Sequence, residues 1–210
     1  MKKFELTSET KINIFGKKLF RIKALISFAD VEAGETGGWV EKEGNVNQSG
    51  NAWVYGDAMV FGDAMVFGDA KVSGDAMVFG NAWVYGDAMV FGNAWVYGDA
   101  KVSGDAKVSG DAMVSGNAWV YGDAKVSGNA WVYGDAKVSG DADYTTIHGF
   151  GTQFRTTTFF RCKDKKVRVA CGCFFGTIPE FREQVKNTRK GKIAEEYLMI
   201  ADLMEKHFEK

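Results

Sequence analysis

The sequence predicts a mainly β protein whose middle part is a parallel β-helix. One six-residue unit is repeated fifteen times without a gap from Gly50 to Ser139: Gly, Asp or Asn, Ala, a variable residue, Val and a second variable residue. Ala and Val stand two apart in each unit, so they point to the same side of an extended strand. No proline interrupts the run, and a period of six cannot keep one apolar stripe on a helix with 3.6 residues per turn. These observations indicate short stacked strands around an Ala/Val core.

Residues 1–37 are expected to form an N-terminal β cap. The apolar-rich segments Lys11–Phe15 and Leu19–Ile22 flank a turn at Gly16-Lys17, which is the pattern of a β-hairpin. The terminal coil of a solenoid exposes unpaired strand edges, so a covering element is needed there. The hairpin is placed in the chain to provide it.

The β-helix itself is predicted to span residues 38–145. Its pattern resembles the left-handed β-helix of hexapeptide-repeat proteins, in which an aliphatic residue and a small residue two before it face inward. The resemblance implies a triangular, left-handed solenoid with three units per coil. Fifteen units then make five coils, about 24 Å long at about 4.8 Å per stacked strand. Three weaker units would extend the rod at its ends: Gly38-Trp-Val, Gly44-Asn-Val and Gly140-Asp-Ala.

Residues 146–210 are predicted to form a small ββαα domain that docks on the end of the rod. Thr156–Cys162 and Val167–Phe174 have the composition of strands. Thr177-Ile-Pro-Glu180 has the pattern of a helix N-terminus with a capping box. A second helix over about Ile193–Phe208 would carry one apolar stripe. Its members are Tyr197, Ile200, Ala201, Met204 and Phe208.

The outward residues of the rod differ between its three predicted walls. If every third unit stacks on the same wall, the wall that begins with the unit at Asp57 contains no lysine, whereas the other two contain several. We call it the middle wall. Exposed patches of aromatic residues and Met usually mark interfaces, so we predict a binding surface there. The alternative is that the stacked aromatic residues only stabilise neighbouring coils. The candidate residues are Met59, Phe61, Met77, Phe79, Trp95, Tyr97, Met113, Trp131 and Tyr133.

Charge and composition limit the kinds of partner. Residues 50–143 hold 5 basic and 12 acidic residues, and residues 144–210 hold 13 and 8. Nucleic acid is therefore not expected along the rod, because phosphate contacts need Lys and Arg. No apolar run approaches the length of a membrane span, and no secretory leader follows the first residues. The odd count of three cysteines favours a reducing compartment. A cytoplasmic location is expected.

A second resemblance covers most of the chain. The segments Leu19-Phe-Arg-Ile-Lys-Ala-Leu, Gly37-Gly-Trp-Val-Glu-Lys-Glu and Cys171-Gly-Cys-Phe, together with the repeat, are similar to uncharacterised proteins of phages and prophages. The resemblance implies a phage-encoded protein that acts in the cytoplasm of a bacterial host. The expected partner is then a host protein, for example one of host defence, or a second copy of the chain. Hexapeptide-repeat proteins are commonly trimers, so a homo-oligomer, either trimer or dimer, is expected.

The repeat contains no residue suited to catalysis. Acyltransferases of the hexapeptide-repeat fold use a catalytic His on a loop that leaves the coil, and the fifteen units contain neither a His nor such a loop. Only His148 and His207 are present. We therefore expect a non-enzymatic binding or assembly module without a cofactor. Two alternatives stay open: an acyltransferase with a pocket near His148 at a protomer interface, and a small-molecule sponge with pockets between protomers lined by Trp and Tyr.

Two metal sites are conceivable from residue types. Cys162, Cys171 and Cys173 with His207 or His148 would make a tetrahedral zinc set. The C-x-C spacing is not the C-x-x-C of a zinc knuckle, so free thiols inside a small domain are favoured. The corner Asp residues suit calcium chemically, but one carboxylate per corner is a poor ligand set. A turn residue that bonds its own backbone is the favoured interpretation.

Overall fold

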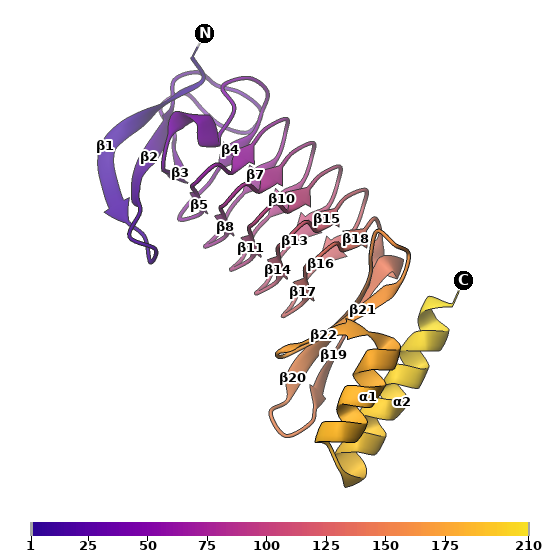
Figure 1. Cartoon of the computed structure of the whole chain (residues 1–210). Coiled ribbons are helices and arrows are strands. Elements are labelled where there is room, and N and C mark those ends of the chain that lie inside the picture. Colours follow the sequence, from indigo (N-terminus) through magenta and orange to yellow (C-terminus); the bar gives the residue numbers. More distant parts are fainter. Residues whose placement is uncertain (1, 210) are drawn as a thin grey trace.

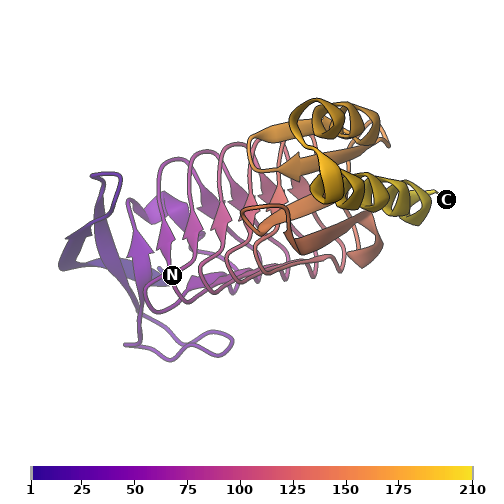
Figure 2. The ribbon, with the colours of Figure 1, turned by 90° about the horizontal axis from the view of Figure 1, so that it is seen from below.

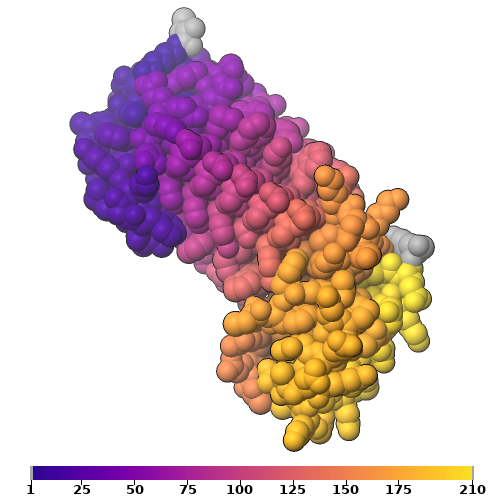
Figure 3. Space-filling view, viewed as in Figure 1, coloured from indigo at the N-terminus to yellow at the C-terminus, as the bar shows by residue number. Residues whose placement is uncertain are grey.

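The computed structural model describes residues 2–209 and shows an elongated molecule with three parts (Figure 1). A β-hairpin lies at one end, a rod of stacked coils follows, and a sheet with two helices lies at the other end. The same order is visible from below in Figure 2 and on the surface in Figure 3. The mainly β fold with a central parallel β-helix is therefore confirmed.

The N-terminal part is a three-stranded antiparallel extension of one wall. The predicted hairpin is confirmed: β1 (Phe4–Ile12) pairs with β2 (Lys18–Ala24), and the first strand begins earlier than expected. Next in order, β3 (Thr36–Val40) pairs antiparallel with β2 and parallel with the first strand of the middle wall. The hairpin thereby continues the rod's own hydrogen-bonding pattern.

The rod is built from two-residue strands, each consisting of the first variable residue and Val of one unit. These strands are β4 (Trp53–Val54), β5 (Met59–Val60), β6 (Met65–Val66), β7 (Lys71–Val72), β8 (Met77–Val78), β9 (Trp83–Val84), β10 (Met89–Val90), β11 (Trp95–Val96), β12 (Lys101–Val102), β13 (Lys107–Val108), β14 (Met113–Val114), β15 (Trp119–Val120), β16 (Lys125–Val126), β17 (Trp131–Val132) and β18 (Lys137–Val138).

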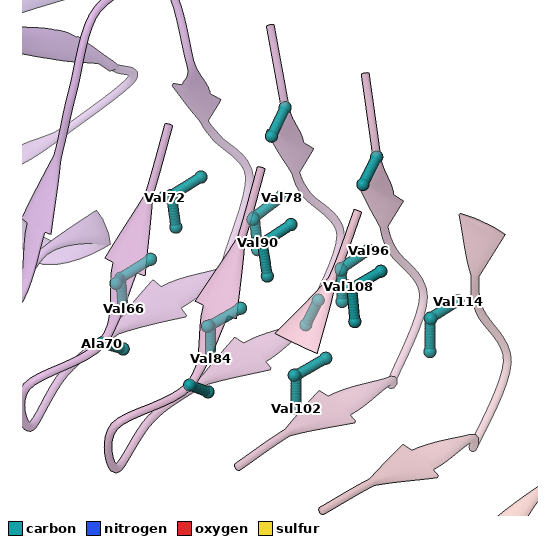
Figure 4. Packing of buried hydrophobic residues seen from close by; sticks show 14 of the residues in the cluster. Val66, Ala70, Val72, Val78, Val84, Val90, Val96, Val102, Val108 and Val114 are labelled. Carbon is teal, nitrogen blue, oxygen red and sulfur yellow. The ribbon is translucent and has the colours of Figure 1, made fainter. Parts of the chain in front are cut away.

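Three parallel sheets form the walls of the rod. The middle wall has the order β3-β5-β8-β11-β14-β17, the second sheet β4-β7-β10-β13-β16 and the third β6-β9-β12-β15-β18. Val60 lies beside Val78, eighteen residues further on, so three units make one coil. The Ala and Val residues of all fifteen units are buried, and the valines of the three walls converge inside the coil (Figure 4). This burial is the main source of the rod's stability.

The corners of the coils require glycine. Gly92, for example, has φ +72°, and a Cβ there would lie 3.0 Å from the backbone nitrogen of Gly110 in the next coil. An L-residue would be strained by that backbone angle and crowded by the neighbouring coil. The repeated Gly is therefore needed both for the turn and for the close stacking of coils.

Two of the three weaker units belong to the rod. Trp39 pairs with Met59, and Val46 forms a parallel bridge with Val66. The third prediction was wrong, because Gly140-Asp-Ala leads into a 3-10 turn, Asp141–Asp143, that leaves Ala142 exposed. A similar short turn, Glu43–Asn45, lies near the other end. The coil therefore ends after β18.

The C-terminal domain has four strands instead of the predicted two. They are β19 (Tyr144–Phe150), β20 (Arg155–Arg161), β21 (Val167–Cys171) and β22 (Phe174–Thr177), followed by α1 (Ile178–Thr188) and α2 (Gly191–Phe208). The capping box of α1 is confirmed, since Thr177 accepts a hydrogen bond from the Glu180 amide and Glu180 accepts one in return. The apolar stripe of α2 is buried as predicted.

The domain closes the end of the rod through β20. Neighbouring side chains of a strand point to opposite faces: Phe159 packs in the core under the helices, whereas Phe160 packs against the Ala/Val core of the rod. An antiparallel bridge joins Ala136 to Cys162, and the Lys163 amide donates to the Asp135 carbonyl at 3.0 Å. The predicted docking on the rod end is what the structure shows.

The N-terminal end of the rod is closed by side chains that cover Trp53. Its ring is fully buried, with the rings of Phe4 and Phe28 at centroid distances of 5.9 and 5.4 Å. Beside it, the Lys3 ammonium donates to the carbonyls of Ala52 at 2.8 Å and Gly50 at 3.2 Å. Burial lowers the pKa of Lys3 to about 8.

Candidate functional site

The register of the middle wall agrees with the prediction. Trp95 lies between Met77 and Met113, and Met113 lies beside Trp131. The second outward position of each unit also stacks, because the rings of Phe61, Phe79 and Tyr97 follow one another at centroid distances of 5.0 Å. The sequence therefore placed every candidate residue on the correct wall.

The hairpin covers the N-terminal half of that wall. The ring of Phe15, at the tip of the hairpin, lies 5.6 Å from Phe61, 5.2 Å from Phe79 and 6.3 Å from Trp95. Phe61 and Met77 are only 4% and 5% exposed. The prediction that they are open to a partner was wrong, because the hairpin tip bends back over the wall. In this half the aromatic residues hold the cap in place.

The C-terminal domain covers the last residue of the stripe. The ring of Tyr133 lies 4.5 Å from Phe175 and 6.1 Å from Phe160, and burial raises its pKa. Trp131, in contrast, stays 42% exposed. The open part of the middle wall is therefore the stretch between the hairpin tip and the C-terminal domain: Tyr97, Met113 and Trp131.

The open stretch is bordered by acidic corners. Amide side chains interrupt the stacked carboxylates: Asn93 donates to Asp111 at 2.9 Å on one edge, and Asn117 donates to Asp135 at 3.2 Å on the other. Each of these Asn residues thereby separates two Asp residues that lie two coils apart, which lowers their repulsion. These hydrogen bonds join neighbouring coils and do not bond a residue to its own turn, so at these corners Asp acts as a ladder residue.

Basic residues accompany Phe15 onto the covered half of the wall. The Lys11 ammonium lies over the Trp39 ring at 4.5 Å from its centroid, and the Arg21 guanidinium lies over the same ring at 4.8 Å. Arg21 also pairs with the corner residue Asp57 at 3.5 Å. Burial lowers the pKa of Lys11, and the nearby carboxylate of Asp57 partly offsets this shift. The wall thus accepts an aromatic side chain together with flanking cations.

The third wall has a different surface, which the sequence analysis did not single out. Its lysines lie over its tryptophans: Lys101 over Trp83 at 4.8 Å and Lys137 over Trp119 at 5.7 Å. A second ring contact, Phe67 to Trp83 at 6.0 Å, lies beside a cavity of about 590 Å³. These tryptophans are 36% and 38% exposed. Because their rings already face a cation, a partner that binds there would have to displace a lysine.

Comparison with protein families agrees with the stacked coils. Residues 70–86, 82–98 and 106–122 each match the model of the YdcK beta solenoid repeat. The chain is a β-solenoid repeat protein. No curated protein matches the sequence. The solenoid matches lie wholly within the regular units, so they concern the rod and not the hairpin or the C-terminal domain.

The candidate metal ligands of this solenoid protein do not come together. Cys162 is buried at the rod junction, Cys171 accepts a hydrogen bond from Thr157, and Cys173 is exposed. His207 packs edge-on against Phe208 on α2. Within residues 2–209 no three His, Cys, Asp or Glu side chains are placed to hold one metal ion. The zinc and calcium alternatives therefore lack a ligand set in the described part of the chain.

The remaining histidine lies at the junction of rod and C-terminal domain. His148 on β19 is exposed, and its Nδ1 lies 3.1 Å from the hydroxyl oxygen of Thr156 on β20. It lines a cavity together with Trp131 of the rod. Helices that could cross a membrane are absent from the part of the chain that the structure describes.

Proposed function

We propose that the protein is a non-enzymatic binding module whose open middle wall holds a protein segment with an aromatic residue flanked by Lys or Arg. The main observation behind the proposal is that the Phe15 ring packs on Phe61 and Phe79, in the covered half of the same wall. The outward positions of the middle wall repeat in every coil. Tyr97, Met113 and Trp131 therefore continue, in the following coils, the aromatic surface on which Phe15 packs. Aromatic residues and Met supply contact area and not acid, base or nucleophile chemistry.

Charge favours a basic partner over face-to-face pairing of two identical walls. Both edges of the open stretch carry Asp, including Asp111 and Asp135, and the wall has no lysine. Two such walls placed face to face would bring like charges together, whereas Lys or Arg on a partner would be attracted. The resemblance to phage proteins makes a bacterial host protein the natural source of such a segment.

The hairpin of the chain itself supplies the probe for a test. A peptide of residues 10–20 carries Phe15 between Lys11 and Lys17. It should bind the intact protein and shift the amide resonances of Tyr97 and Met113 in NMR titration. The matched control is the same peptide with Phe15→Ser, which should bind at least about tenfold more weakly because the ring contacts are lost.

Variants of the protein decide whether the wall is the site. Met113→Lys should weaken peptide binding, since it places a cation in the apolar stripe. Lys107→Met, on the second sheet, should leave binding unchanged. Equal binding of both peptides, or binding that survives Met113→Lys, would overturn the proposal. A stable oligomer in solution that Met113→Lys dissociates would give the wall to a second copy of the chain and also overturn the basic segment as its occupant.

A further inference from the structure

The junction between the rod and the C-terminal domain contains a cavity of about 560 Å³. It lies where β17 meets β19, β20 and β21, at the lower end of the rod in Figure 1. Trp131 lines it from the rod, His148 from β19, and Phe154 and Arg155 from the start of β20. Ligand sites commonly lie between domains and combine apolar walls with a few polar groups. This cavity has both.

The lining of the cavity includes an arginine but no carboxylate. Arg155 and His148 are its ionisable basic side chains, and Asn129 and Thr156 add hydrogen-bonding groups. Four other cavities in the described part of the chain each include at least one Asp or Glu in their lining. In a protein with a net charge of −1 and an acidic rod, a cavity lined by an arginine and by no acid favours an anionic ligand.

The Arg155 guanidinium lies against the chain at Gly172 and has no carboxylate partner among the described residues. A Cβ on Gly172 would lie 2.3 Å from its Nη1, so the guanidinium lies directly against the backbone there. Among the described residues, the arginines that form ion pairs are Arg21, Arg161, Arg168 and Arg182. Arg155 has no carboxylate of these residues within ion-pair distance. An unpaired guanidinium can bind a carboxylate or phosphate with two parallel hydrogen bonds.

Two aromatic side chains face the same cavity from opposite parts of the molecule. Trp131 is 42% exposed and Phe154 is 65% exposed. Phe154 also has φ +48°, a backbone angle that is costly for a residue with a Cβ. Strained backbone of this kind tends to occur at binding sites, where it fixes the direction of a side chain. Here the backbone angle places the exposed Phe154 ring at the cavity that Trp131 also lines.

We propose that the junction cavity binds a planar aromatic anion. Its ring would pack on Trp131 and Phe154, and its carboxylate or phosphate would bind Arg155 and His148. A nucleotide and an aromatic carboxylic acid share this chemistry, and the probes below distinguish them. The site adjoins the proposed peptide surface and shares Trp131 with it, whereas Arg155, His148 and Phe154 lie outside the middle wall.

Calorimetric titration with four probes tests the proposal on the full chain. Adenosine 5′-monophosphate and indole-3-acetate each carry a ring and an anionic group, whereas adenosine lacks the anion and inorganic phosphate lacks the ring. At least one of the first two should bind at least about tenfold more tightly than both of the last two. Equal affinity for adenosine and its monophosphate, with no binding of indole-3-acetate, would overturn the anion site. Absence of binding by all four at millimolar concentration would overturn the proposal.

Variants assign the binding to the named side chains. Arg155→Gln should weaken the binding of the anionic probe about tenfold or more. Its control, Arg189→Gln, changes an exposed arginine at the end of α1 and should have no effect. Phe154→Gly removes the ring at a backbone angle that glycine adopts freely, so the fold should persist while binding weakens. Unchanged affinity in both Arg155→Gln and Phe154→Gly would overturn the assignment.

Discussion

The two ends of the rod are closed by opposite means. At the N-terminal end the hairpin continues a wall of the rod and bends back over it, so the cap buries Phe61 and Met77. At the C-terminal end a separate sheet is placed against the last coil through Phe160, and a cavity stays open beside Trp131. A cap that extends a sheet of the rod packs on the outer surface of the rod and buries part of it. A cap with its own core covers less of that surface: of the aromatic stripe it contacts Tyr133 and leaves Trp131 exposed.

The largest expected effect comes from removing the ring that closes each end. Trp53→Ala and Phe160→Ala should each lower the free energy of unfolding by about 3–5 kcal/mol, because both rings are fully buried. A solenoid couples mainly neighbouring coils, so the damage should be local. Hydrogen exchange should show Trp53→Ala exposing the Tyr55 amide and Phe160→Ala exposing the Trp119 amide. Equal loss of protection at both ends would contradict the comparison.

Corner glycines should distinguish the middle of the rod from its ends. Gly92→Ala forces a Cβ into a positive φ and against the Gly110 backbone. The backbone angle should cost about 1–2 kcal/mol, and the crowding about 1–3 kcal/mol more. Gly56→Ala is the matched control, since Gly56 also has positive φ but a Cβ there meets nothing within 4 Å. Urea unfolding measures both, and equal destabilisation would show that stacking adds nothing at the corners.

The hairpin tip tests how firmly the N-terminal cap holds the wall. Phe15→Ser should lower the free energy of unfolding of the hairpin by about 1–2 kcal/mol, because ring pairs are worth about 0.5–1.5 kcal/mol each and the tip is half exposed. Trp95 should then become more accessible to an acrylamide quencher. Ile14→Ser is the control, since Ile14 is 74% exposed in the same turn. Comparable effects of both changes would mean that the tip does not rest on the wall.

The smallest effect concerns Lys3 and depends on pH. Its pKa is about 8 in the folded protein, against an ordinary value of 10.5. Between these values the unfolded chain binds more protons, so the stability of the wild type should rise with pH in this window. Relative to Lys3→Met, we expect a gain of up to about 1 kcal/mol from pH 7 to pH 9. Chemical denaturation of both proteins at each pH measures it. A difference that does not change with pH would show that Lys3 is not buried as an ammonium.

The sequence was sufficient for features that one unit determines. Ala and Val two apart predicted the core, and the three units per coil that the hexapeptide-repeat resemblance implied predicted which residues stack, including Trp95 beside Met113. It was not sufficient where segments distant in the chain meet. Nothing local to Phe15 shows that its ring returns to Phe79. The strand β19 was missed because it directly follows the turn Asp141–Asp143, a segment that resembled one more unit of the repeat.

The candidate sites show the same limit. The middle wall was predictable because its members share one position in the repeat. The junction cavity was not, because Trp131, His148 and Arg155 belong to three different strands that only the docked domain brings together. His148 was noted as a residue near the end of the rod, but neither its proximity to Trp131 nor the absence of acids around it follows from spacing. Tertiary packing determines both.

The stacking of coils also gives the molecule an adjustable length. Removing eighteen residues, for example 80–97, would delete one coil and shorten the rod by about 4.8 Å, and every remaining Val would still lie on its own wall. The hairpin and the C-terminal domain would keep their relative orientation. Removing only six residues would instead rotate the domain by about a third of a turn, onto the neighbouring wall. The distance between the hairpin tip and the junction cavity can therefore be changed in steps of one coil, about 4.8 Å each.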